Sequence, residues 1–126
     1  MTRISGFGTG EKRGNKYNAK RTYSELCGRE FSSKAEARRG EELALLERAG
    51  EIGKLEYQPK FILCQEPEIT YTADFRYTKK VPFGDTPYTI SMVVVEDVKG
   101  VLNRETRVKL AWLKEKHGLT VRLITK

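Results

Sequence analysis

Apolar residues at helical spacing predict a first helix over residues 33–49. Ser33 and Glu36 match the S-x-x-E capping box at its start, and Gly50 supplies the stop. A short hairpin over residues 23–31 is expected to lead into this helix. The apolar face of the helix is formed by Ala37, Leu43, Leu46 and Ala49.

Beyond Gly50 the apolar residues alternate with a period of two, which predicts strands over residues 54–64, 69–78 and 88–99. Pro59 indicates an edge position or a bulge in the first of these strands. The run Val93-Val94-Val95 is typical of a strand buried on both faces.

A second helix is predicted over residues 103–116, followed by a last strand over residues 119–125. Asn103 is suited to be its N-cap, and Gly118 lies at its stop. The order after the hairpin is helix, three strands, helix, strand. The final strand, helix and strand are expected to form a right-handed crossover with the two strands parallel. The predicted class is α/β with a mixed sheet.

The amino-acid composition limits the classes of protein to which the chain can belong. The chain has 126 residues, 38% hydrophobic and 33% charged, which suits a single globular domain, placed at residues 23–126. Cys27, Cys64 and His117 are too few for a disulfide scaffold or a four-ligand zinc site, unless subunits share ligands. With no apolar run of roughly 20 residues and no secretory signal pattern, we expect a soluble, cytoplasmic protein.

Charge favours a polyanionic partner. The 24 basic and 17 acidic residues give a net charge of +7, and residues 1–22 carry six basic residues against Glu11, a surplus of five. We therefore predict a flexible basic arm over residues 1–22 that lies along phosphates; a disordered solubilising tail fits the composition equally well. The side chains expected to contact nucleic acid are Arg13, Lys16, Lys20 and Arg21 in the arm, and Lys109 and Lys114 in the second helix.

Charged residues interrupt two otherwise apolar strands. Asp74 lies in an aromatic strand, and Asp97 and Lys99 end the valine-rich strand on one face, while Glu96 and Val98 share the other face. Two carboxylates from neighbouring strands and a backbone carbonyl, here that of Val98, are ligands that Mg²⁺ accepts.

Two further residues would complete such a site. Glu36 of the first helix could supply a third carboxylate, and Lys99 could orient an attacking water beside a phosphate. A purely structural alternative has Asp97 and Lys99 as a solvated ion pair, Asp74 facing water and Glu36 closing its capping box.

Three segments together resemble the PD-(D/E)XK nuclease superfamily, in particular the branch of TnsA-like transposon nucleases and phage junction-resolving endonucleases. They are Ser33-x-x-Glu36, Tyr71-Thr-Ala-Asp74-Phe75 and Val95-Glu96-Asp97-Val98-Lys99-Gly100. Residues 15–124 also resemble a family of small phage and prophage proteins of uncharacterised function, through N-K-Y-N, F-x-S-K-x-E-A-R-R, Y-x-A-D-F and V-V-E-D-V-K-G segments.

The resemblance implies a restriction-endonuclease-like αβββαβ core and a site that binds Mg²⁺ or Mn²⁺. Asp74 matches the aspartate of the PD element, Asp97 the D/E position, Lys99 the lysine and Glu36 the helix glutamate. The chain departs from the pattern in three ways: Ala73 replaces the proline, Glu96 adjoins Asp97, and Glu41 and Glu42 compete with Glu36 as the helix ligand.

The sequence therefore predicts a Mg²⁺-dependent endodeoxyribonuclease encoded by a phage or prophage and acting in the host cytoplasm. Branched DNA such as a Holliday junction is a candidate substrate, and symmetric cutting of a junction would require a homodimer. Two alternatives stay open: a non-catalytic nucleic-acid-binding module with the same fold, and an interaction protein whose basic arm binds an acidic partner.

Overall fold

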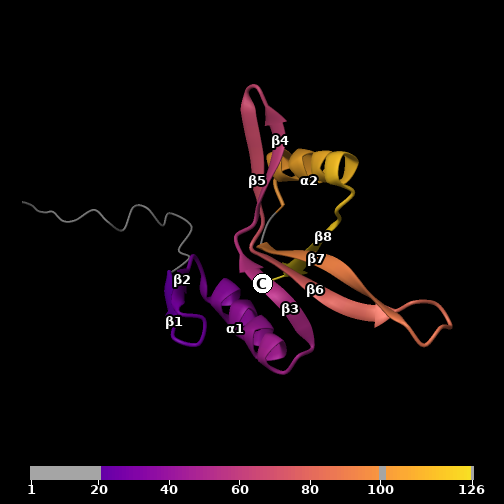
Figure 1. Cartoon of the computed structure of the whole chain (residues 1–126). Helices are drawn as coiled ribbons and strands as arrows, with labels where there is room; N and C mark the ends of the chain where they lie inside the picture. Colours follow the sequence, from indigo (N-terminus) through magenta and orange to yellow (C-terminus); the bar gives the residue numbers. More distant parts are fainter. Residues whose placement is uncertain (1–20, 100–101, 126) are drawn as a thin grey trace, which may run out of the picture.

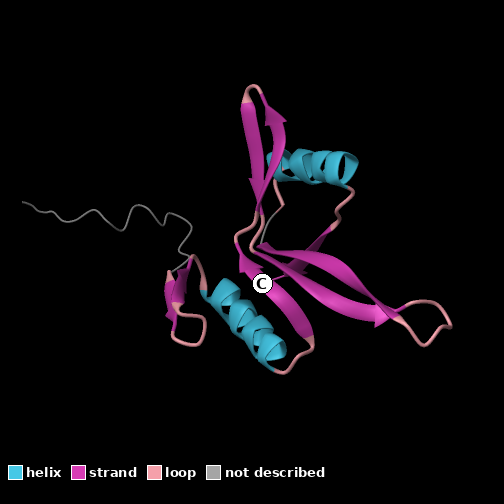
Figure 2. Cartoon of the chain, viewed as in Figure 1, coloured by secondary structure: helices cyan, strands magenta, loops and turns pink. Residues whose placement is uncertain are grey.

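The computed structural model describes residues 21–99 and 102–125, so most of the predicted basic arm, with Arg13, Lys16 and Lys20, lies outside the described residues. Figure 1 shows the arrangement of the elements, and Figure 2 shows the two helices far apart with strands between them. In chain order the elements are β1 (Thr22–Ser24), β2 (Arg29–Phe31), α1 (Lys34–Arg48), β3 (Ile52–Tyr57), β4 (Lys60–Gln65), β5 (Glu68–Thr72), β6 (Phe75–Pro82), β7 (Thr89–Lys99), α2 (Arg104–His117) and β8 (Val121–Thr125).

The central sheet has four strands in the order β3-β6-β7-β8. β3, β6 and β7 pair antiparallel, whereas β7 and β8 pair parallel with Asp97 opposite Leu123. The predicted α/β class with a mixed sheet is confirmed, as is the parallel arrangement of the last two strands.

The prediction of two continuous strands is wrong, because each of the two segments bends and pairs with a different strand after the bend. The segment predicted at 54–64 breaks after Tyr57, and the segment predicted at 69–78 breaks at Asp74. At the first break Gln58 has a φ of 54° and Pro59 has no N–H to donate to a ladder. As a result β3 and β6 stay in the central sheet, while β4 and β5 form a separate hairpin that turns away from it (Figure 1).

The helix caps follow the sequence pattern. Ser33 accepts a hydrogen bond from the Glu36 N–H at 3.1 Å, and Asn103 accepts one from the Thr106 N–H at 2.8 Å. Gly118 ends α2 with a φ of 69°, which glycine adopts without strain. No helix among the described residues has both the length and the apolar character needed to cross a membrane.

Apolar side chains pack on both faces of the central sheet. The core on the α1 face contains Phe31, Ala37, Leu43, Ile52, Phe75, Tyr77 and Val98. The core on the α2 face contains Phe61, Leu63, Tyr71, Ala73, Val95 and Leu113. Asp74 lies between Ala73, which belongs to the second core, and Phe75, which belongs to the first.

The valine run of β7 is only partly buried, which corrects the prediction of a strand buried throughout. Val95 is buried, whereas Val93 is exposed. Within the described residues β8 pairs with β7 over Val95–Lys99 only, so the first half of β7 has no neighbour on that side.

Candidate active site

The candidate acids meet where the bent strands leave the central sheet. Asp74 stands at the bend between β5 and β6, Asp97 and Lys99 lie at the end of β7, and Glu36 lies in the first turn of α1. Two backbone hydrogen bonds stabilise the bend. The Gln58 N–H donates to the Asp74 carbonyl at 2.9 Å, and the Asp74 N–H donates to the Glu96 carbonyl at 3.1 Å. The first bond joins Asp74 to the end of β3, and the second fixes it next to the end of β7.

Asp74 brings the three acids together. Its Oδ2 accepts a hydrogen bond of 2.7 Å from the Val98 N–H, and its carboxyl group also lies within hydrogen-bonding reach of the carboxyl groups of Glu36 and Asp97. Burial, together with these two acidic neighbours, raises the pKa of Asp74 to about 9. A hydrogen bond between two carboxyl groups needs a proton, and the raised pKa favours the protonated form of Asp74.

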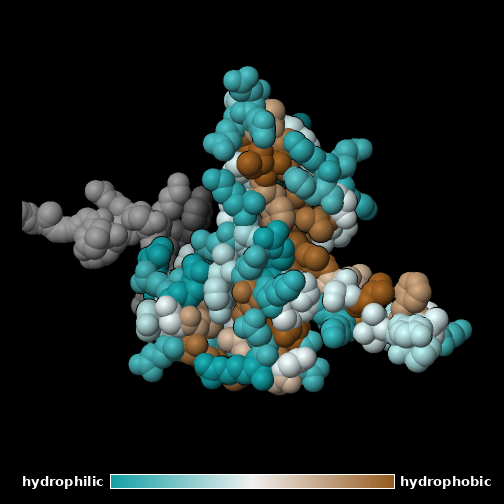
Figure 3. All heavy atoms as spheres, in the orientation of Figure 1, coloured by the Kyte–Doolittle hydropathy of each residue, from teal (hydrophilic) through white to brown (hydrophobic). Residues whose placement is uncertain are grey.

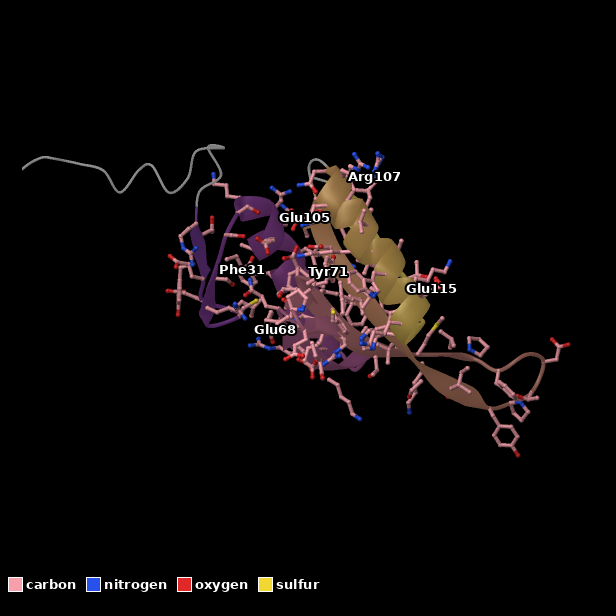
Figure 4. The ribbon with its side chains drawn as sticks, turned by 90° about the horizontal axis from the view of Figure 1, so that it is seen from above. Phe31, Glu68, Tyr71, Glu105, Arg107 and Glu115 are labelled. Carbon is pink, nitrogen blue, oxygen red and sulfur yellow. The ribbon has the colours of Figure 1, made fainter. Side chains whose placement is uncertain are left out.

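Asp97 is buried on the α2 face of β7. Its Oδ2 accepts a hydrogen bond from the hydroxyl of Tyr71 in β5 and lies 3.4 Å from the Lys99 Nζ. Burial and the bond to Asp97 raise the pKa of Tyr71, so its hydroxyl stays a donor. Figure 4 shows Tyr71 in the interior, between the parts of the ribbon that carry α1 and α2. The sequence reasoning missed Tyr71, although it stands three residues before Asp74 in the quoted segment.

Glu36 is the helix acid that reaches this site. It is buried, and its carboxylate accepts a hydrogen bond from the Ser32 hydroxyl and lies near Asp74. The two competing acids point elsewhere: Glu41 accepts a bond of 2.7 Å from the Ser24 hydroxyl, and Glu42 accepts one of 2.9 Å from Arg39. Glu36 thus gives its backbone N–H to the helix cap and its carboxylate to the acid cluster.

Glu96 lies on the opposite face of β7, as strand parity predicts. It is fully buried, and Arg39 of α1 donates to both of its carboxylate oxygens at 2.8 Å. The hydroxyl of Tyr77 donates to it as well, and the guanidinium of Arg122 lies 3.7 Å away. Burial alone would raise the pKa of Glu96, but the bonds from Arg39 and Tyr77 hold it below its usual range.

The ion pair between Arg39 of α1 and Glu96 of β7 joins the helix to the strand. Arg39 stands one helical turn after Glu36, so the ion pair with Glu96 also sets the distance of Glu36 from the end of β7. The sequence reasoning did not find Arg39 or Tyr77, because their partner is far away along the chain.

The predicted nucleic-acid contacts are dispersed. Arg21 pairs with Glu30 at 2.9 Å and Lys109 with Glu105 at 3.4 Å, whereas Lys114 is exposed on α2. In Figure 4, Arg107 and Glu115 project from the outer side of α2. Among the described contacts, none joins a basic residue of α2 to the acids of the candidate site.

The fit of a divalent cation can be tested on these contacts. In the part of the chain that the structure describes, no three His, Cys, Asp or Glu side chains are arranged so that they could hold a metal ion. The acids bond to one another, to Tyr71 and to the Val98 N–H instead. Their chemistry does fit: three carboxylates are the hard oxygen donors that Mg²⁺ and Mn²⁺ require. A cation would have to replace the bonds between the carboxyl groups.

Comparisons with known proteins identify the family of the chain but no activity. No curated protein and no solved structure matches the chain. A family model matches residues 14–125, which include Glu36, Asp74, Asp97 and Lys99. The chain belongs to the family described as "Protein of unknown function (DUF1064)".

Proposed function

We propose that the protein is a Mg²⁺- or Mn²⁺-dependent endodeoxyribonuclease that hydrolyses DNA phosphodiester bonds, with branched DNA of a phage or prophage as its substrate. The observation that carries the proposal is the convergence of Glu36, Asp74 and Asp97, with the Lys99 ammonium 3.4 Å from Asp97. The three acids come from a helix, a strand bend and a strand end, so the fold itself assembles them.

Three buried carboxyl groups in contact are unfavourable for folding, because like charges repel and each loses its hydration. Such clusters are typical of functional sites, where a ligand offsets the repulsion. Tyr71 and Lys99 stabilise the carboxylate of Asp97, the first by a hydrogen bond and the second by its positive charge. Among the described contacts, no basic side chain pairs with Asp74. This supports a cationic ligand at the cluster.

The roles of the residues follow from their positions. Asp74 and Asp97 would hold the cation, with Glu36 and the Val98 carbonyl completing the set; the bound cation would supply charge stabilisation at the phosphate and a more acidic water. Lys99 is one-third exposed and touches Asp97, so its ammonium can reach both the site and a phosphate in solvent. Tyr71 orients Asp97 through its hydroxyl.

The order of the elements adds support. Without the separate β4–β5 hairpin, the helices and central-sheet strands run α1, β3, β6, β7, α2 and β8, which is the order of the αβββαβ core that the resemblance to PD-(D/E)XK nucleases implies. The acids stand at the corresponding places in that order.

The test is cleavage by the full chain. Labelled four-way junction, flap, linear duplex and single strand are incubated with wild type or Asp97→Ala in Mg²⁺, Mn²⁺, Ca²⁺ or chelator. We expect the wild type to cut at least one substrate with Mg²⁺ or Mn²⁺, and Asp97→Ala to cut slower by several orders of magnitude while binding is kept. Glu68→Ala, which removes an exposed acid of β5, is the matched control and should cut normally. Undiminished cutting by Asp97→Ala would refute the site.

One observation favours a second candidate, a non-catalytic nucleic-acid-binding module: the described acids are bonded to one another and not arranged as a metal site. In that case the wild type would bind DNA in gel shifts and cut none of the four substrates with any cation.

A further inference from the structure

The strands β6 and β7 extend well beyond their neighbours in the central sheet. β3 pairs with β6 as far as Lys79, and β8 pairs with β7 from Val95 onward, so the segment from Lys79 to Met92 is a hairpin that has no other described strand neighbour beyond Lys79. We call it the projecting hairpin, and Figure 1 shows it pointing away from the rest of the chain. A two-stranded hairpin is marginally stable by itself in water.

One face of the projecting hairpin is apolar. Because opposite residues of an antiparallel pair share a face, Val81 with Ile90 and Lys79 with Met92 lie on the face that carries Tyr77 and Val94 nearer the core. Phe83 and Tyr88, joined by a backbone hydrogen bond of 3.0 Å, continue that face at the turn.

The other face of the projecting hairpin is mostly polar. It carries the pairs Lys80 with Ser91 and Pro82 with Thr89. This alternation is typical of a strand pair that buries one face.

No described element covers the apolar face. Phe83, Tyr88, Ile90 and Met92 are 53%, 71%, 48% and 52% exposed, and Figure 3 shows apolar side chains on the projecting hairpin. The same face of the sheet is covered by α1 only nearer the core, where Tyr77 is buried. The apolar stripe is thus the continuation of a core that ends without a cover.

Charge and area indicate which partner fits. The projecting hairpin carries Lys79, Lys80 and Asp85, a net charge of +1, in a chain of +7. A net charge of +1 gives a polyanion little to bind on this stretch, and two such hairpins repel each other only weakly. At about 200 Å² for a large apolar side chain, the four exposed residues offer roughly 450 Å² per copy. With adjoining backbone, two copies would bury about 1,000 Å², the lower limit of a specific interface.

We propose that the chain forms a two-fold symmetric homodimer in which the apolar faces of two projecting hairpins pack on each other. The face meets the same face of the second copy, as a two-fold interface requires. The small area makes the dimer weak, so it dissociates on dilution. The dimer does not depend on nuclease activity.

Sedimentation velocity of the full chain from about 1 to 200 µM tests the proposal, a range chosen for an interface at the lower size limit. The wild type is expected to shift from monomer to dimer across this range. Ile90→Lys and Tyr88→Lys, both on the apolar face, should remain monomers. Ser91→Lys, the neighbouring exposed residue on the polar face, is the matched control and should dimerise as the wild type does. Circular dichroism verifies that each variant is folded.

Three results would overturn the proposal. The first is a wild type that stays monomeric at every concentration. The second is a Ser91→Lys variant that loses the dimer together with Ile90→Lys, because the interface would then not be the apolar face. The third is a monomeric wild type whose DNA affinity falls on Ile90→Lys, which would make DNA the partner. None of these results bears on the cleavage test.

Discussion

The carboxylate of Asp74 accepts a hydrogen bond of 2.7 Å from the backbone N–H of Val98, the residue between Asp97 and Lys99. The bond joins the bend between β5 and β6 to the end of β7. With the bond from the Asp74 N–H to the Glu96 carbonyl, it sets the position of Asp74 relative to Asp97, and neither bond requires Asp74 to be charged. Folding and chemistry can be separated by substitution at this position.

Asp74→Asn is expected to stabilise the fold while it abolishes cutting. The amide oxygen can still accept the Val98 N–H, and a neutral group replaces an acid that burial and two acidic neighbours disfavour in its charged form. We expect a gain of about 1 kcal/mol in the free energy of unfolding, which is several degrees in Tm for a domain of this size. Thermal unfolding and the cleavage assay measure the two effects.

The comparison variant is Asp74→Ala. It leaves the Val98 N–H without its acceptor and should lower the free energy of unfolding by about 1–3 kcal/mol. An Asp74→Asn protein that is less stable than the wild type would show that the carboxyl group serves the fold, and would remove the argument for a ligand.

Of the four glutamates of α1, the three candidates Glu36, Glu41 and Glu42 should differ sharply in their effect on cutting. Only Glu36 lies near Asp74, so Glu36→Gln should slow cleavage by roughly ten- to a thousand-fold if it helps to hold the cation. Glu42→Gln loses only an exposed pair with Arg39, and Glu41→Gln keeps an acceptor for Ser24. Initial cleavage rates at several Mg²⁺ concentrations measure this, and equal rates for all three variants would contradict the role of Glu36.

Local sequence signals predicted the parts of the site but not the way the chain bends around it. The capping box placed Glu36 in the first turn of α1, and strand parity placed Asp97 and Lys99 together with Glu96 opposite. Both depend on residues within a few positions of one another. The bends at Gln58 and Asp74 were not predicted, because Pro59 marks a break without saying which strand each half will pair with.

The hydrogen-bond partners of the buried polar groups also could not be predicted from the hydrophobic pattern of the sequence. Arg39 and Glu96 are 57 residues apart, and Tyr71 and Asp97 are 26 apart. Which polar groups meet is decided by packing across the sheet, which alternation along one strand does not encode. The exposure of Val93 has the same origin, since it depends on where β8 begins to pair.

Glu96→Ala should unfold the protein more readily than any substitution at the acid cluster. It leaves the guanidinium of Arg39 and the hydroxyl of Tyr77 without the buried carboxylate that binds them. Breaking a buried ion pair of this kind costs about 3–5 kcal/mol. Denaturant unfolding of Glu96→Ala, with Glu56→Ala as the exposed, ion-paired control in β3, measures the loss. A loss below about 1 kcal/mol, the range of exposed pairs, would contradict the structural role.

Lys99→Ala is expected to remove cutting and to leave DNA affinity almost unchanged. The ammonium is held at the site by Asp97, and it is one cation among 24 basic residues. Loss of a positioned catalytic cation slows cleavage by about 10²- to 10⁴-fold, whereas affinity should fall only slightly. Lys109→Ala, whose ammonium pairs with Glu105 on α2, is the matched control. Equal cleavage by the two variants would exclude Lys99 from the chemistry.

Deleting residues 1–14 should weaken binding to every DNA substrate without moving the position of any cut. The deleted segment holds Arg3, Lys12 and Arg13 against Glu11, so two net positive charges are lost, and all four candidate site residues remain. Phosphate contacts act through the release of counterions and read no bases, so the slope of log affinity against log salt should become shallower by up to about two units. Gel-shift titrations of junction and duplex between about 50 and 200 mM salt, a range over which such contacts are strongly weakened, measure the slope.

The control is the intact chain with Arg122→Ala, which removes one positive charge that already pairs with Glu96. An unchanged slope in the truncated protein would show that this part of the basic segment makes no contact with phosphates, whereas a shifted cut would mean that it helps to select the scissile bond.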